Sequence, residues 1–100
     1  MNPKKQKKSP LRLSQPVDEE IDLHGLAIDE ALVQVELAIE RYRRNPKASL
    51  RIIHGHSSGN KDSIKGAIRR NLETQWRGRI QSFRPELGNA GATLIYLGSS

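Results

Sequence analysis

The chain contains no cysteine, and only 4% of its 100 residues are aromatic. Without cysteine it can form neither a disulfide nor a thiolate metal site. No apolar run approaches the roughly 18 residues that a membrane-spanning helix requires. No apolar segment follows the basic N-terminus, as one would in a secretory signal. We therefore expect one domain that resides in the cytoplasm and does not contact a membrane.

Two common catalytic patterns are also missing. No glycine-rich loop ending in Gly-Lys-Ser or Gly-Lys-Thr is present, which argues against nucleotide hydrolysis. Ser57 and Ser58 lie close to histidines, but no Gly-x-Ser-x-Gly pattern surrounds them, so a serine hydrolase is disfavoured. We expect no organic cofactor.

Positive charge is in excess and unevenly distributed. The net charge is +6, and residues 1–16 hold five basic residues, three prolines and no acid. Such a segment buries too little apolar surface to order itself, so we predict a disordered basic arm over residues 1–16 and a folded domain over residues 17–100. Within that domain residues 17–40 carry eight acids and no Lys or Arg, whereas residues 41–100 carry 12 basic residues and three acids. A basic half and a basic arm favour a polyanionic partner such as nucleic acid.

The hydrophobic pattern predicts alternating strands and helices. We expect strands at about 20–23, 49–53, 79–83 and 92–97, and helices at about 29–44, with Asp29 as N-cap, and 62–76. Trp76 and Tyr42 fall on apolar helix positions, which predicts core packing rather than base stacking. Right-handed crossovers between parallel strands then place both helices on one face, which gives a two-layer α/β sandwich in the order β-α-β-α-β-β.

A His-Gly dipeptide follows each of the first two predicted strands. These are His24-Gly25 and His54-Gly55. Parallel strands end at the same edge of a sheet, where ligands bind in open α/β folds, so we expect the two histidines to lie near each other. Asp22 is two residues before His24 and projects from the same side of the strand.

Three segments together resemble the small MutS-related (Smr) domain. They are Ile21-Asp22-Leu23-His24-Gly25, Ile52-Ile53-His54-Gly55, and Gly88-Asn89-Ala90-Gly91-Ala92-Thr93, within residues 20–97. The resemblance implies a mixed four-stranded sheet with two helices on one side, binding to DNA or RNA and, in several members, endonuclease activity that in some cases uses a divalent metal. Ser57 stands where the family has a second glycine after its second histidine, and Asn89 where a second glycine is common in the last motif.

The predicted site follows from these residues. We assign acid/base chemistry or phosphate contact to His24 and His54, and the orientation of a histidine or the binding of Mg²⁺ or Mn²⁺ to Asp22. A zinc site made of these three residues with His56 is a less favoured alternative. Further candidates for contact with phosphate, from backbone N-H groups, a polar loop or cations, are Gly25, Arg51, Gly55, His56, Ser57, Ser58, Gly59, Lys65, Arg69, Arg70, Gly88 and Gly91.

Three functions remain open from the sequence. The leading one is an endonuclease that nicks or cleaves DNA or RNA. The second is a non-catalytic nucleic-acid or ribosome-binding module in which the histidines only hold the turns. The third is a protein-interaction adaptor that uses the acidic segment around the first helix.

Overall fold

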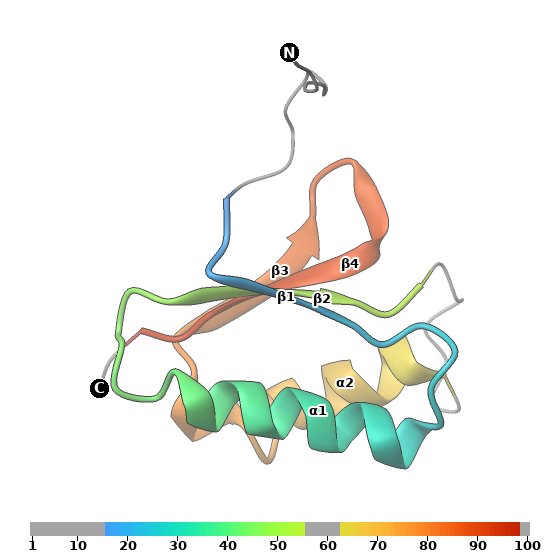
Figure 1. The fold of residues 1–100 in the computed structure, drawn as a ribbon, viewed down its shortest axis with the longest axis horizontal. Coiled ribbons are helices and arrows are strands. Elements are labelled where there is room, and N and C mark those ends of the chain that lie inside the picture. Colours follow the sequence, from blue (N-terminus) through green and yellow to red (C-terminus); the bar gives the residue numbers. More distant parts are fainter. Residues whose placement is uncertain (1–15, 56–62, 99–100) are drawn as a thin grey trace.

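The computed structural model describes residues 16–55 and 63–98, in which two helices cover one face of a four-stranded sheet (Figure 1). The elements are β1 (Glu19–Asp22), α1 (Ile28–Arg41), β2 (Ser49–Ile53), α2 (Ile64–Glu73), the 3-10 helix η2 (Arg77–Arg79), β3 (Ser82–Glu86) and β4 (Asn89–Tyr96). The strand order is β1-β2-β4-β3, with β1 parallel to β2 and the other two pairs antiparallel. The predicted mixed two-layer α/β sandwich is confirmed.

Strand alternation divides the sheet into two faces. Ile21, Leu50, Ile52 and Ile95 point to the helices and join one buried cluster with residues of α1 and α2. Trp76 is fully buried in this cluster, as its spacing predicts, and Tyr42 packs against it half-buried. The other residues of each strand, including Asp22 and Arg51, lie on the face away from the helices.

Both helices are shorter than predicted because local hydrogen bonds set their ends. α1 starts after Ala27, whose N-H donates to the Glu30 carboxylate at 3.2 Å, and not at Asp29. The chain turns after Tyr42, whose carbonyl accepts from the Asn45 N-H at 2.8 Å. α2 starts after Ser63, whose hydroxyl accepts from the Gly66 N-H at 3.0 Å. None of the helices in the described ranges is long and apolar enough to cross a membrane.

The segment before the last strand is a hairpin rather than the predicted long glycine loop. β3 begins at Ser82, later than predicted, because Arg77–Arg79 form η2. Only Leu87 and Gly88 separate β3 from β4, and Gly88 has a φ of 78° that suits such a turn. The predicted disordered arm, apart from Pro16, lies outside the described residues.

Candidate functional site

Asp22 and His24 form a hydrogen-bonded pair at the end of β1. His24 Nδ1 lies 2.6 Å from Asp22 Oδ1, and the His24 backbone N-H donates to the same oxygen at 3.2 Å. Their side chains remain 56% and 70% exposed, for Asp22 and His24 respectively. The structure therefore places both on the same side of the strand end, as predicted, and open to solvent.

This contact changes the pKa of both groups. The hydrogen bond to the Asp22 carboxylate, with its negative charge, raises the pKa of His24 above its ordinary value of 6.5. The same hydrogen bonds lower the pKa of Asp22 below its ordinary value of 3.8. An ionised carboxylate accepts, so Nδ1 carries the proton of a neutral His24 and Nε2 presents a lone pair. Within the described part of the chain, no hydrogen bond engages Nε2.

His54 has a different environment from His24. It is only 4% exposed, with Nδ1 2.9 Å from the Gly55 carbonyl and Nε2 2.9 Å from the Thr93 hydroxyl. Nδ1 therefore donates to the carbonyl, and Nε2 accepts from the hydroxyl. Both ring nitrogens therefore have partners inside the protein, and in this structure His54 holds the second turn. Its acid/base role stays a prediction from the sequence.

Three predicted motifs meet at this edge of the sheet. The Leu23 N-H donates to the Ile53 carbonyl at 2.8 Å. The N-H groups of His54 and Gly55 both donate to the Gly91 carbonyl, at 2.9 and 3.1 Å. Gly55 has a φ of +92°, and a Cβ added there would lie 3.9 Å from the Cβ of His24. The two His-Gly turns are thus adjacent, as predicted, although only one imidazole is exposed.

Arg51 does not have the position that phosphate contact requires. It is 8% exposed, and its guanidinium donates to Glu86 at 2.8 Å and to Glu20 at 2.8 Å on the face away from the helices. These carboxylates, Glu86 first, raise its pKa. Arg51 therefore joins β2 to β3 and β1, and contact with phosphate would require its guanidinium to leave these carboxylates.

Three predicted phosphate-binding cations, Lys65, Arg69 and Arg70, lie on α2. Lys65 Nζ lies 3.5 Å from the Ala90 carbonyl, just before Gly91. Arg69 is exposed and pairs with Glu73 at 3.5 Å, and Arg70 is also exposed. Of these three cations, Lys65 is thus the one that contacts the glycine motif.

The remaining predicted residues fall into two groups. Gly25 has a φ of 84° and nothing within 4 Å of an added Cβ, and Gly88 occupies the hairpin turn. His56, Ser57, Ser58 and Gly59 lie outside the described residues. Thr93, the partner of His54, was missed by the sequence analysis, although strand alternation from Ile95 places it on the helix side.

The described residues do not fit a dedicated metal site. In ranges 16–55 and 63–98 no group of three or more His, Cys, Asp or Glu side chains could hold an ion. Asp22 and His24 supply two donors that are hydrogen-bonded to each other, and the ring nitrogens of His54 are engaged.

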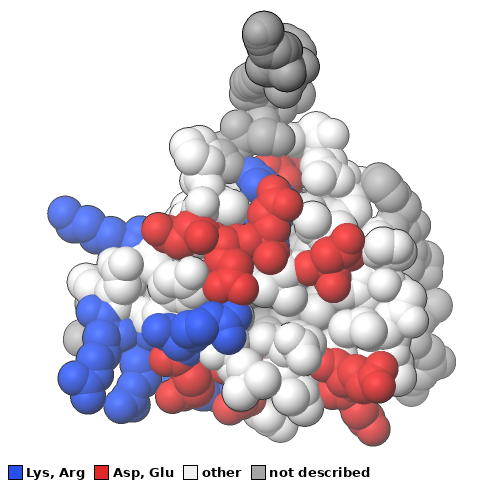
Figure 2. All heavy atoms as spheres, viewed as in Figure 1, with Lys and Arg blue, Asp and Glu red and all other residues white. Residues whose placement is uncertain are grey.

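Charge separates along the long axis of the view in Figure 2. Lys and Arg gather at the end where α1 terminates, with some acidic side chains among them, while the rest of this face shows mainly Asp and Glu. Arg43, Arg44 and Arg79 line a hollow at that end. This basic end lies away from the Asp22–His24 pair, which follows β1 at the opposite end of the sheet (Figure 1).

Comparison with known proteins gives consistent matches. The model of the Smr domain family matches residues 21–98. Endonuclease MutS2 of Thermus thermophilus is 35% identical over 82 residues, which are 78% of this chain and 10% of that protein. An Smr domain-containing protein of Schizosaccharomyces pombe is 39% identical over 90 residues, 87% of this chain and 41% of that protein.

A solved structure agrees with these relatives. The crystal structure of the Smr domain of Thermus thermophilus MutS2 superposes with a TM-score of 0.64 at 34% identity. The match covers 81% of this chain and 99% of that one. By contrast, the chain spans less than half the length of both curated relatives.

Proposed function

This chain belongs to the Smr domain family. We therefore propose that it binds nucleic acid and cleaves it, and that the Asp22–His24 pair catalyses the cleavage. One observation carries the proposal: the exposed, hydrogen-bonded pair at the end of β1. A carboxylate that orients an imidazole next to solvent is an arrangement suited to moving a proton during phosphodiester cleavage.

The chemistry proposed for this pair is general base catalysis. A hydroxyl, from water or from a ribose, attacks phosphorus while His24 Nε2 takes its proton. The bond from phosphorus to the leaving oxygen then breaks, that oxygen takes a proton from solvent water, and Asp22 stabilises the imidazolium through Nδ1-H. Lys65 and the backbone N-H of Gly25 are the proposed groups that offset negative charge on the phosphate.

The relatives support this proposal at different levels. MutS2 of Thermus thermophilus is named an endonuclease, but that name describes a protein of which this chain matches 10%. Its Smr domain, taken alone, is matched over 99% of its length. Nucleic-acid binding and cleavage by this chain are therefore proposals that must be tested on this chain.

A second function is favoured by the burial of His54. Cleavage commonly uses one group to take a proton and another to give one, and here a single exposed histidine is available among the described residues. A binding module, for free nucleic acid or for the ribosome, would use the same turns without cutting.

The deciding experiment compares cleavage by the purified chain and three variants. The substrates are labelled single-stranded RNA, structured RNA and supercoiled plasmid, each with Mg²⁺, Mn²⁺ or EDTA. We expect His24→Ala to abolish cleavage and Asp22→Asn to slow it, whereas Asp29→Asn, an exposed acid outside the pair, leaves the rate unchanged. If the wild type retards these substrates on a gel but leaves them intact, the chain is a binding module and not a nuclease.

A further inference from the structure

We propose that a groove between α2 and β3 holds an unpaired strand of nucleic acid. This inference rests on the proposed function and adds to it a binding surface and a substrate class. The groove, called the α2–β3 groove below, consists of two hollows that share Leu72 and Phe83.

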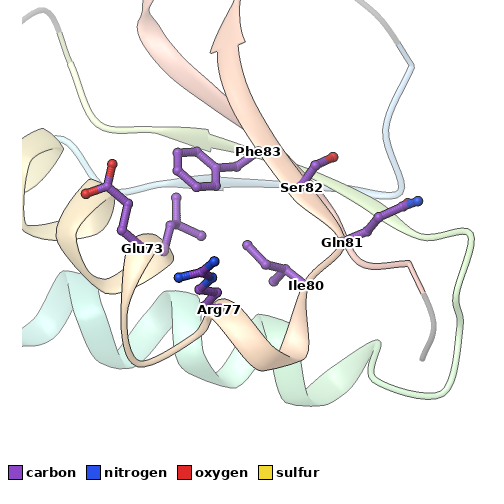
Figure 3. A pocket seen from close by; sticks show the side chains of 7 residues that line it. Glu73, Arg77, Ile80, Gln81, Ser82 and Phe83 are labelled. Carbon is purple, nitrogen blue, oxygen red and sulfur yellow. The ribbon is translucent and has the colours of Figure 1, made fainter.

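The two hollows follow one another along α2. The first, of about 120 Å³, is bounded by Lys65, Arg69, Pro85 and Thr93. The second, of about 360 Å³, is bounded by Glu73, Arg77, Gln81 and Ser82 (Figure 3). β3 is the last strand of the sheet, so within the described residues no further strand covers its outer side.

The helix side of the groove carries a stripe of charge. Lys65, Arg69 and Glu73 follow one another at four-residue spacing on α2, and Arg77, at the start of η2, bounds the second hollow. The single acid, Glu73, pairs with Arg69 at 3.5 Å while both side chains stay more than half exposed. Exposed pairs of this kind are weak, so a phosphate can compete for Arg69. Lys65, Arg69 and Arg77 together favour a polyanionic ligand.

The strand side of the groove is apolar. The ring of Phe83 projects from β3 above the second hollow, and Ile80 and Arg77 lie below it (Figure 3). Pro85 continues this surface into the first hollow. Aromatic and apolar side chains beside cations are the usual surface for single strands, because every base has a π-face that can stack. In a duplex those faces are already stacked, so the groove suits unpaired nucleotides.

The groove also begins next to the turns that carry the proposed chemistry. Thr93 bounds the first hollow and is the hydroxyl partner of His54 at 2.9 Å. Lys65 bounds the same hollow and lies 3.5 Å from the Ala90 carbonyl. A strand in the groove therefore runs toward the edge where the His-Gly turns meet.

The test measures fluorescence anisotropy of a labelled oligothymidine, a labelled oligouridine and the corresponding duplexes over a range of salt. We expect the wild type to prefer the single strands. The pair Arg69→Gln with Arg77→Gln should reduce the slope of log affinity against log salt by about 1.4, because each lost contact with a single strand removes about 0.7. Phe83→Leu should weaken binding at least about fivefold through lost stacking.

Two controls separate the groove from charge in general. Arg43→Gln with Arg44→Gln makes the same charge change at the basic end and should leave the slope nearly unchanged. Glu73→Gln removes the only acid of the stripe and should tighten binding. The arginine variants alter exposed side chains, so they test the groove even if Phe83→Leu fails to fold, which circular dichroism will show.

The outcomes distinguish the groove from the function on which it rests. If the wild type binds nucleic acid but the groove variants lose no more affinity than the control pair, the groove is wrong and the proposed function stands. A preference for the duplex also overturns the groove. If the wild type binds none of the probes, the groove and the proposed function are both wrong.

Discussion

Two histidines in the same dipeptide have opposite environments in this protein. His24 is exposed and bonded through Nδ1 to Asp22, whereas His54 is buried and bonded through both nitrogens. An imidazole can exchange protons with a substrate only if one nitrogen is accessible. We therefore propose the chemistry for His24 and a positioning role for His54.

The Asp22–His24 pair predicts a pH dependence. His24 must be neutral to act as a base, so cleavage should rise with pH through a pKa above 6.5. Asp22→Asn removes the carboxylate that raises this pKa, so the rise should move to lower pH while the plateau rate falls. A pH profile of kcat/KM, together with an NMR titration of the His24 ring, measures both effects. An unchanged His24 titration in Asp22→Asn would contradict the pairing.

The pKa shifts of His24 and Asp22 also determine how the stability of the fold depends on pH. The folded-state pKa of His24 is raised, so its contribution is fully present below pH 6.5 and is lost as pH rises through the folded value. The pKa of Asp22 is lowered, so its contribution is present above pH 3.8 and is lost as pH falls through the folded value. Urea unfolding of the wild type and Asp22→Asn across pH should show both trends.

The contact between Thr93 and His54 predicts a cost in stability. Thr93→Val keeps the shape of the side chain but leaves the buried Nε2 of His54 without its hydroxyl donor. We expect the free energy of unfolding to fall by about 1–3 kcal/mol in urea. Thr93→Ser keeps a hydroxyl and should lose less than the valine variant. Equal losses would show that packing, not the hydrogen bond, is what Thr93 contributes.

At the scale of elements, the turn after β2 brings the second motif against the first. Gly55 adopts a φ of +92°, and its N-H and that of His54 share the Gly91 carbonyl. This turn links the ends of β2 and β4 next to His24. The backbone conformation at Gly55 therefore affects both the position of His24 and the connection between β2 and β4.

Gly55→Ala tests this turn. A side chain disfavours positive φ by about 1–2 kcal/mol, so we expect a comparable loss of unfolding free energy in urea. The added Cβ would lie 3.9 Å from the Cβ of His24, and that contact should also shift the His24 ring signals in NMR spectra. Gly78→Ala, which meets nothing within 4 Å and has no positive φ, is the matched control and should change little.

At the scale of the molecule, the fold pairs charges that the sequence keeps apart. Residues 17–40 contain acids but no Lys or Arg. In the fold, Glu19 pairs with Arg41 at 2.8 Å. Glu36 and Glu40 pair with Arg79 at 3.0 and 2.7 Å. Trp76 adds a hydrogen bond from its indole to Glu36 at 2.9 Å. These contacts fasten α1 to the segments around it, so much of the acidic half is used within the protein.

The buried Arg51–Glu86 pair predicts the largest loss of stability. The Glu86 side chain is 1% exposed and lies 2.8 Å from the buried Arg51 guanidinium, so its removal takes a buried carboxylate partner from that charge. We expect Glu86→Ala to lower the unfolding free energy by about 3 kcal/mol. Glu20→Ala removes a 55% exposed partner and should cost less than about 1 kcal/mol. Similar losses in the two variants would contradict this account.

The layers, the order of the elements and the edge where the motifs meet follow from local sequence patterns. Strand alternation, helical spacing and the handedness of crossovers are local or nearly local rules, so one chain was enough to apply them. They correctly placed Asp22 and His24 together and Trp76 in the core. The same rules set helix ends poorly, because the terminal hydrogen bonds of Ala27 and Ser63 depend on single side chains.

Which of the candidate residues are exposed depends on how the elements pack against one another. His54 is buried against Thr93, 39 residues away, and Arg51 against Glu86, 35 residues away. The α2–β3 groove likewise joins residues from two elements that no sequence spacing connects. Burial and long-range pairing arise when separate elements pack, and a residue's local pattern does not contain its distant partner.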